Sequence, residues 1–184
     1  NLLTYWPHGE TQGYFLFLAS PTVGGKEAKA RPKQVTFVVD TSGSMAGDKI
    51  DQAKAALRQV IGGLNPGDRF NVIAYHTAVM PLWPAVRDVN AASAKEAFAF
   101  VESLRAEGGT NIQEALTSAL AWTTQNGMAN VMLFLTDGRP TVGSTETDAI
   151  LNAVSAANPR GRARLFVFGV GVDVNTVLLD RLAI

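Results

Sequence analysis

Three side chains that carry oxygen follow one apolar segment of the sequence at intervals of two residues. Asp40, Ser42 and Ser44 come directly after residues 35–39, a β-branched and aromatic run that is typical of a buried strand. In a nearly extended loop, residues two apart face the same side, and Gly43 permits a bend, so the three side chains can converge. Carboxylate and hydroxyl oxygens, without imidazole or thiolate, suit a hard divalent cation.

Two further positions offer oxygen ligands of the same kind. Thr110 stands at a predicted helix start, and Asp137 follows the apolar run 131–135. Ligands of open α/β sheets sit at the carboxyl ends of the strands, so we expect these side chains to meet there. We therefore predict one metal site, occupied by Mg²⁺ or alternatively by Mn²⁺ or Ca²⁺, with the ligands Asp40, Ser42, Ser44, Thr110 and Asp137.

The predicted ligand set leaves the ion with uncompensated charge, because three of the five ligands are neutral hydroxyls. Such an ion attracts one more carboxylate from outside the domain. We expect a protein partner to supply this group from an Asp or Glu side chain. The residues expected at the rim of the site are Arg139, Thr141, Gly143 and Ser144.

Each of these residues also has a simpler structural interpretation. Ser42 and Ser44 can cap the next helix, Thr110 can be an N-cap, and Asp137 with Gly138 can form a turn. Taken singly, each simpler interpretation is favoured. Their joint occurrence at the ends of successive strands favours the metal site.

The elements that must position these residues alternate between apolar strands and amphipathic helices. This order predicts an α/β fold with a doubly wound, mostly parallel sheet, an antiparallel edge strand and helices on both faces. Capping-box patterns are found at Ser93 with Glu96 and at Thr110 with Gln113. The predicted strands cover residues 13–19, 35–39, 70–75, 79–84 at an edge, 131–135 and 165–168, and the helices cover 50–61, 93–104, 110–120, 148–157 and 174–182.

Length and composition limit the classes of function. The 184 residues suffice for one domain, which we place at 34–184 after an extension and linker at 1–33, and the chain is expected to be a piece of a longer protein. Sixteen basic residues balance sixteen acidic ones, so overall charge favours neither nucleic acid nor an anionic membrane. The absence of cysteine excludes disulfides and thiolate chemistry, and no apolar run is long enough to span a bilayer.

The motif Val38-Val39-Asp40-Thr41-Ser42-Gly43-Ser44-Met45 resembles the Asp-x-Ser-x-Ser signature of von Willebrand factor type A domains. Gly109-Thr110-Asn111 and Leu135-Thr136-Asp137-Gly138 are similar to that family's second and third metal-site motifs. Four segments are similar to the A domain of inter-alpha-trypsin inhibitor heavy chains and their bacterial relatives. They are residues 37–40, 66–71, 136–143 and 168–171.

This resemblance implies a six-stranded Rossmann-like sheet, a metal-ion-dependent adhesion site, and binding to proteins rather than catalysis. It also implies a preceding β-rich domain, and residues 13–21 look like the tail of that domain or the strand that connects it to the A domain. We find no strand after the helix at 174–182, so we expect the last strand of the family's sheet to be missing. An extracytoplasmic or cell-surface location is favoured, and a cytoplasmic one stays open.

Three other functions are considered. A haloacid dehalogenase-type phosphotransferase needs a second Asp two residues after the first, where Ser42 stands. A serine hydrolase needs a histidine, and only His8 and His76 exist; a turn or rim role is favoured for His76. The third alternative, a regulatory or assembly module of an intracellular complex, uses the same metal site, and the sequence does not separate it from adhesion. Oligomeric state is not predicted.

Overall fold

The computed structural model of the chain describes residues 2–5, 14–17, 31–122, 128–171 and 174–183. The chain forms two units, Asn1–Ala30 and Arg31–Ile184. In the first unit, β1 (Leu2–Tyr5) pairs with β2 (Tyr14–Phe17) in antiparallel fashion. The strand predicted at 13–19 is therefore confirmed as β2, β1 was not predicted, and the linker lies mostly outside the described residues.

The second unit is built on a sheet of six strands in the order β5-β4-β3-β7-β8, with β6 also paired to β4. The pairs β3–β4, β3–β7 and β7–β8 are parallel, whereas β5 and β6 run antiparallel to β4. The predicted mostly parallel sheet with an antiparallel edge strand is thus confirmed. The strands are β3 (Lys33–Asp40), β4 (Arg69–Tyr75), β5 (Val79–Pro81), β6 (Arg87–Asp88), β7 (Ala129–Thr136) and β8 (Ala163–Gly169).

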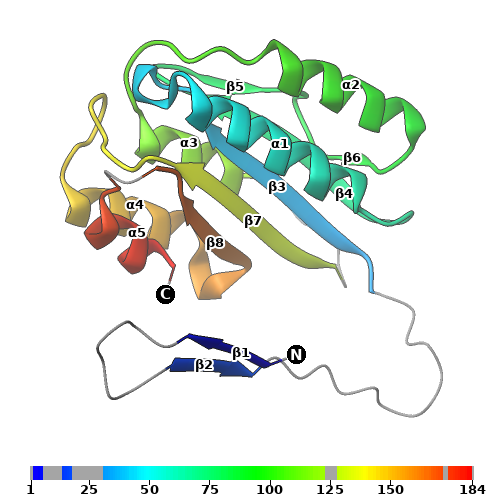
Figure 1. Cartoon of the computed structure of the whole chain (residues 1–184). Coiled ribbons are helices and arrows are strands. Elements are labelled where there is room, and N and C mark those ends of the chain that lie inside the picture. The colour runs from blue at the N-terminus through cyan, green and yellow to red at the C-terminus, as the bar shows by residue number, and fades with distance from the viewer. Residues whose placement is uncertain (1, 6–13, 18–30, 123–127, 172–173, 184) are drawn as a thin grey trace. The chain divides into compact units, whose positions relative to one another are not determined.

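Helices cover both faces of this sheet (Figure 1). One core contains α1, α2 and the odd-numbered side chains of β3, among them Phe37; the other contains α3, α4, α5 and residues such as Val38. The alternation follows from the period of two along a strand, which sends successive side chains to opposite faces. The helices are α1 (Asp48–Gly62), α2 (Ala91–Ser103), α3 (Ile112–Leu120), α4 (Thr147–Ala157) and α5 (Thr176–Leu182), with 3₁₀ turns at Gly43–Met45 and Pro159–Gly161.

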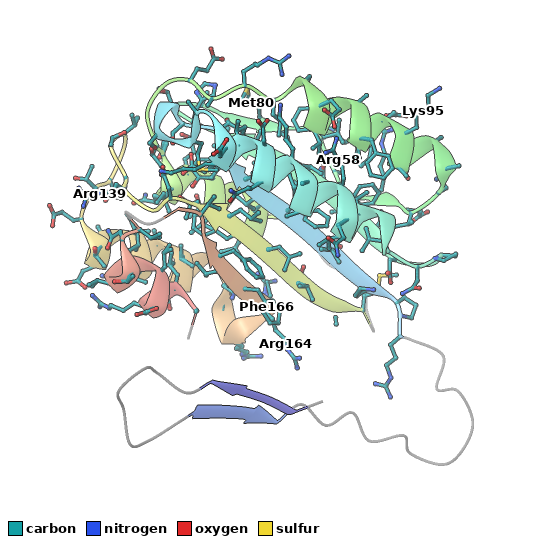
Figure 2. The ribbon with its side chains drawn as sticks, in the orientation of Figure 1. Arg58, Met80, Lys95, Arg139, Arg164 and Phe166 are labelled. Atoms are coloured by element: carbon teal, nitrogen blue, oxygen red, sulfur yellow. The ribbon has the colours of Figure 1, made fainter. Side chains whose placement is uncertain are left out.

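Strand β8 is the outer strand on its side of the sheet. Within the described ranges, no further strand pairs with it, so the strand that the family resemblance implies is not found there. Phe166 and Phe168 of β8 are 48% and 49% exposed, and Figure 2 shows Phe166 beside Arg164 along this strand. The sheet therefore leaves apolar side chains uncovered at this edge.

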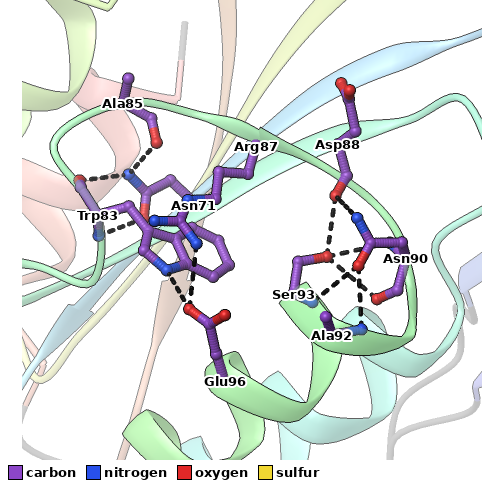
Figure 3. Close-up of polar contacts among 9 residues, drawn as sticks. All are labelled: Asn71, Trp83, Ala85, Arg87, Asp88, Asn90, Ala92, Ser93 and Glu96. Carbon is purple, nitrogen blue, oxygen red and sulfur yellow. Dashed lines mark hydrogen bonds and ion pairs between the residues drawn. The ribbon is translucent and has the colours of Figure 1, made fainter.

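The N-terminus of α2 is capped differently from the prediction. Asn90 is the N-cap, its side chain accepts hydrogen bonds from the backbone of Ala92 and Ser93, and the Ser93 hydroxyl accepts one from the Asn90 backbone (Figure 3). The predicted box of Ser93 with Glu96 was wrong by one turn, because Glu96 instead accepts hydrogen bonds from Trp83 and Arg87. Asn is as good an N-cap as Ser, so composition alone does not separate the two starts.

Asp68 fixes the turn between α1 and β4. This buried carboxylate accepts hydrogen bonds from the backbone amides of Lys33 and Asn65 at 3.0 and 2.9 Å, and it forms an ion pair with the Lys33 side chain. Burial raises the pKa of Asp68, but the hydrogen bonds from Lys33 and Asn65 and the charge of Lys33 outweigh it, so the pKa is lowered. The carboxylate therefore joins the first residue of β3 to the turn before β4.

We expect Asp68→Ala to lower the free energy of unfolding by about 2 to 4 kcal/mol, because two buried amides and one ammonium lose their acceptor. Urea denaturation followed by circular dichroism measures the difference. Because the folded pKa of Asp68 is lowered, its contribution is complete above the unfolded value and is lost as the pH falls through the folded value. The difference in the free energy of unfolding between wild type and Asp68→Ala must therefore shrink in strong acid.

Candidate metal centre

The candidate site lies where the chain leaves the carboxyl ends of β3 and β7. After β3 the chain continues to β4 on one side of β3, and after β7 it continues to β8 on the other side. The loops that follow β3 and β7 therefore lead in opposite directions, which makes this edge a topological switch point. Asp40 is the last residue of β3 and Asp137 directly follows β7. The strand order therefore brings the two predicted carboxylates to one edge of the sheet.

Asp40 is fully buried, and both of its carboxylate oxygens accept hydrogen bonds. The Oδ1 atom accepts from the Ser42 amide at 2.8 Å, and Oδ2 accepts from the Thr136 hydroxyl at 2.6 Å and the Tyr75 hydroxyl at 3.2 Å. These donors hold the carboxylate in one orientation. Thr136 and Tyr75 belong to the two strands beside β3. Thr136 is part of the third motif, but neither residue was predicted as a partner of Asp40.

The hydroxyls of Ser42 and Ser44 lie 3.1 Å apart. Adjacent ligands of an octahedral Mg²⁺ ion are about 3 Å apart, since each stands about 2.1 Å from the ion. Neither serine is the N-cap of α1, which is Gly47, and Ser42 makes no side-chain capping bond to the 3₁₀ turn that follows it. Ser42 stands at the N-cap position of that turn through its backbone, but neither serine hydroxyl caps α1, so the interpretation of the two hydroxyls as caps of that helix is wrong.

The Thr110 segment reaches the site as the residue before the N-cap of α3. The N-cap is Asn111, whose side chain accepts from the Glu114 amide, so the predicted capping box of Thr110 with Gln113 was one residue early. Thr110 is 3% exposed, and within the described residues its hydroxyl forms no hydrogen bond. Its side-chain oxygen is thus available for a ligand.

Backbone hydrogen bonds tie the site's loops to one another. The Gly43 amide donates to Gly108 at 3.0 Å, and the Glu107 amide donates to Thr41 at 2.8 Å. On the other side, the Thr110 amide donates to the Thr141 hydroxyl at 2.8 Å, and the Thr110 carbonyl accepts from the Thr141 amide at 3.0 Å. The Thr110 segment therefore lies between the other two loops and is bonded to both.

Gly109 makes this close packing of loops sterically possible. A Cβ atom at position 109 would lie 2.5 Å from the Val142 side chain and 2.9 Å from the Thr141 hydroxyl. No side chain can therefore be accommodated there without a shift of the loop after β7.

Asp137 is 5% exposed and carries an ion pair that the sequence reasoning missed. The Lys49 ammonium nitrogen lies 3.0 Å from Asp137 Oδ2. Lys49 stands in the first turn of α1, where a positive charge opposes the helix dipole. That unfavourable placement is the one sequence signal that could have drawn attention to Lys49.

The electrostatics of the site are dominated by the buried carboxylate of Asp40. Burial raises the pKa of Asp40, and repulsion by Asp137 adds to this, whereas hydrogen bonds from Ser42 and Thr136 lower it; the net direction is upward. Burial and the nearby Asp40 charge likewise raise the pKa of Tyr75 far above its ordinary value, so its hydroxyl stays protonated and donates to Asp40. A bound cation would relieve the unfavourable charge of Asp40.

The predicted rim residues take separate roles. The Thr141 hydroxyl accepts a hydrogen bond from the Thr110 amide, and a Cβ on Gly143 would lie 2.7 Å from the Asn111 side chain. Ser144 is half-buried. Arg139 is exposed and lies on the loop between β7 and α4 (Figure 2). His76 acts in a turn, as favoured, because its Nδ1 atom accepts from the amides of Thr77 and Ala78 at 2.7 and 3.3 Å. Among the described residues, no three His, Cys, Asp or Glu side chains gather for a metal ion, so the candidate ligands remain two carboxylates and three hydroxyls.

Comparison with known proteins identifies the family of this chain. The sequence profile of the von Willebrand factor type A domain matches residues 33–184. The chain belongs to the von Willebrand factor type A family. It is 36% identical to human inter-alpha-trypsin inhibitor heavy chain H4 over 180 residues, which are 94% of this chain and 19% of that protein. The human heavy chain H1 is 33% identical over 156 residues, or 80% of this chain and 17% of that one.

A solved structure confirms the type A fold. The von Willebrand factor type A protein from Catenulispora acidiphila superposes with a TM-score of 0.72 at 25% identity, covering 84% of this chain and 37% of that one. The chain spans about a fifth of the length of the heavy chains that it matches. No helix among the described residues is long and apolar enough to cross a membrane.

We expect Asp40→Asn to raise the melting temperature in EDTA, because it removes a buried charge and keeps an oxygen for the Ser42 amide. The Thr136 and Tyr75 hydroxyls, which donate to Asp40 Oδ2, can turn and accept from the new amide group. The folded pKa of Asp40 is raised, so its stabilising contribution is present below the unfolded value and is lost as the pH rises through the folded value. The rise in melting temperature caused by Asp40→Asn must therefore be larger at pH 7 than in acid. Differential scanning fluorimetry measures it. A variant less stable than wild type at pH 7 in EDTA contradicts this account of the site.

Proposed function

We propose that the type A domain of this chain is a protein-binding module that depends on a divalent metal. In this proposal Asp40, Ser42, Ser44, Thr110 and Asp137 hold Mg²⁺, or alternatively Mn²⁺ or Ca²⁺, and a carboxylate from a partner protein completes the coordination. The observation that carries the proposal is the pair of Ser42 and Ser44 hydroxyls 3.1 Å apart, neither of which caps α1, beside the buried carboxylates of Asp40 and Asp137.

The ligand chemistry favours a hard cation with one position left for an outside group. The five side chains offer only oxygen, which Mg²⁺ and Ca²⁺ prefer. Two carboxylates neutralise a divalent ion formally, but Asp137 already shares its charge with Lys49. The ion therefore keeps an attraction for an additional carboxylate.

Binding accounts for the site better than catalysis does. Ser42 occupies the position where a phosphotransferase of the dehalogenase type needs an Asp, and its hydroxyl contacts Ser44. His76 uses Nδ1 in its own turn, so it is not poised as the base of a serine hydrolase. As part of the same proposal we assign the domain to the extracytoplasmic space or the cell surface, in line with its similarity to inter-alpha-trypsin inhibitor heavy chains.

We expect 1 mM Mn²⁺ to raise the melting temperature of the wild-type chain and to have much less effect on Thr110→Val. Valine has the shape of threonine without the hydroxyl, and that hydroxyl has no hydrogen bond to lose among the described residues. A ligand that binds only the folded state at 100 times its Kd adds about 2.7 kcal/mol of stability. The measurement is differential scanning fluorimetry with Mn²⁺ against EDTA.

Thr117→Val is the matched control. Thr117 lies on α3, its hydroxyl donates to the Gln113 carbonyl at 2.8 Å, and it is not a predicted ligand. The control must keep the full Mn²⁺ response. An equal response in Thr110→Val and wild type removes Thr110 from the metal site, and no response in wild type removes the site.

We also expect peptides captured by the immobilised chain in Mg²⁺ and released by EDTA to be rich in Asp and Glu. A random peptide library displayed on phage supplies the candidates, and sequencing compares the eluted pool with the starting library. The Asp40→Asn chain, treated identically, must give no such enrichment. Acidic peptides that bind equally well in EDTA would refute a carboxylate held by the metal.

A further inference from the structure

The ammonium group of Lys49 lies against the candidate metal site, although none of the metal-site motifs includes this residue. Its nitrogen stands 3.0 Å from Asp137 Oδ2, and the two side chains are 29% and 6% exposed. Lys49 belongs to α1, whereas Asp137 follows β7, 88 residues later in the chain. The ion pair therefore joins the helix after the first metal-site motif to the loop of the third.

The path of the Lys49 side chain is built into the loop after β8. Gly171 has φ of +94°, and a Cβ at this position would lie 2.7 Å from Lys49 Cε and 3.3 Å from Nζ. This backbone conformation is rarely adopted by residues other than glycine. A residue without a side chain thus leaves the space through which the lysine reaches Asp137.

Lys49 changes the charge that a metal ion meets. Asp40 and Asp137 carry two negative charges and Lys49 returns one positive charge, so the metal-free site has a net charge of minus one. A divalent ion turns this into plus one. Without the lysine, the same loading would leave a neutral site. A positive charge at this distance opposes the entry of a cation and attracts an incoming carboxylate.

We propose that Lys49 is a resident cation of the metal site, which competes with the divalent ion for Asp137 and keeps the loaded site positive toward its partner. This inference rests on the proposed function and deepens it. Lys49 acts through Asp137, so it is a positioning residue rather than a metal ligand. Its effect is to weaken metal binding while favouring capture of a carboxylate.

The test is a Mn²⁺ titration of the whole chain by isothermal titration calorimetry. We expect Lys49→Met to lower the Kd for Mn²⁺ by about fivefold, the effect of removing roughly 1 kcal/mol of unfavourable interaction. Lys49→Gln, which keeps a polar end, must show the same gain, and Lys49→Arg, which keeps the charge, must stay near the wild-type Kd. The gain must also shrink at high KCl concentration, since salt screens charge interactions.

Lys54→Met is the matched control for the loss of one positive charge. Lys54 lies on the same helix, but its ammonium contacts the Glu102 carbonyl at 3.3 Å rather than the site. Its Kd for Mn²⁺ must remain within about twofold of wild type. In EDTA, Lys49→Met is expected to melt at a lower temperature than wild type, because Asp137 loses its counter-charge, and Lys54→Met is not.

Lower stability without metal together with tighter metal binding is a result that a purely structural lysine would not give. If wild type binds Mn²⁺ but Lys49→Met and Lys49→Gln bind it no more tightly, the role of Lys49 is overturned while the metal site stands. If wild type and both neutral variants bind no Mn²⁺, the metal site itself is refuted, and the inference is refuted with it.

Discussion

The burial of the Asp40 carboxylate at the end of the central strand is the constraint on which the site depends. A buried charge is unfavourable unless donors surround it, and here the donors come from the next residues of the chain and from both neighbouring strands. The pKa of Asp40 is still raised, because burial outweighs these hydrogen bonds. The fold thus holds an anion in place without fully compensating it, which is the condition under which a cation binds favourably.

The surrounding loops are organised so that the hydroxyls of Ser42, Ser44 and Thr110 do not cap α1 or α3. Asn111 caps α3 and Gly47 is the N-cap of α1, while backbone hydrogen bonds and the hydroxyls of Thr77 and Thr141 tie the loops together. Had Ser44 or Thr110 served as the helix cap, its hydroxyl would face an amide. The separation of capping from ligation therefore explains why these residues are suited to a metal ion. In our proposal, Lys49 balances the same site: it stabilises Asp137 when the ion is absent and opposes the ion when it enters.

The covering of the sheet differs between its centre and its β8 edge. Each unit is a separate arrangement of strands, and the chain corresponds to about a fifth of the heavy chains that it matches. Phe166 and Phe168, each about half exposed, show that the sheet is covered less completely at β8 than at β3, where every residue from Gln34 to Asp40 is buried. The candidate metal centre lies at the carboxyl end of the fully covered strand β3.

The sequence by itself determined the order of the larger strands and helices and the mostly parallel sheet with an antiparallel edge strand, because local periodicity carries that information. Strands β1 and β6 were not predicted, and the five oxygen ligands stay a prediction. The helix starts at Asn90 and Asn111 were missed, since several capping residues stand close together and packing chooses among them. The sequence placed Tyr75 in a strand and Thr136 in the third motif. It did not show that these two hydroxyls donate to Asp40 or that Lys49 pairs with Asp137, because each contact joins separate elements. Only the tertiary structure decided these contacts: hydrogen bonds and ion pairs depend on distance in space, and residues 35, 96 and 88 positions apart become neighbours only when the sheet forms and α1 packs on it.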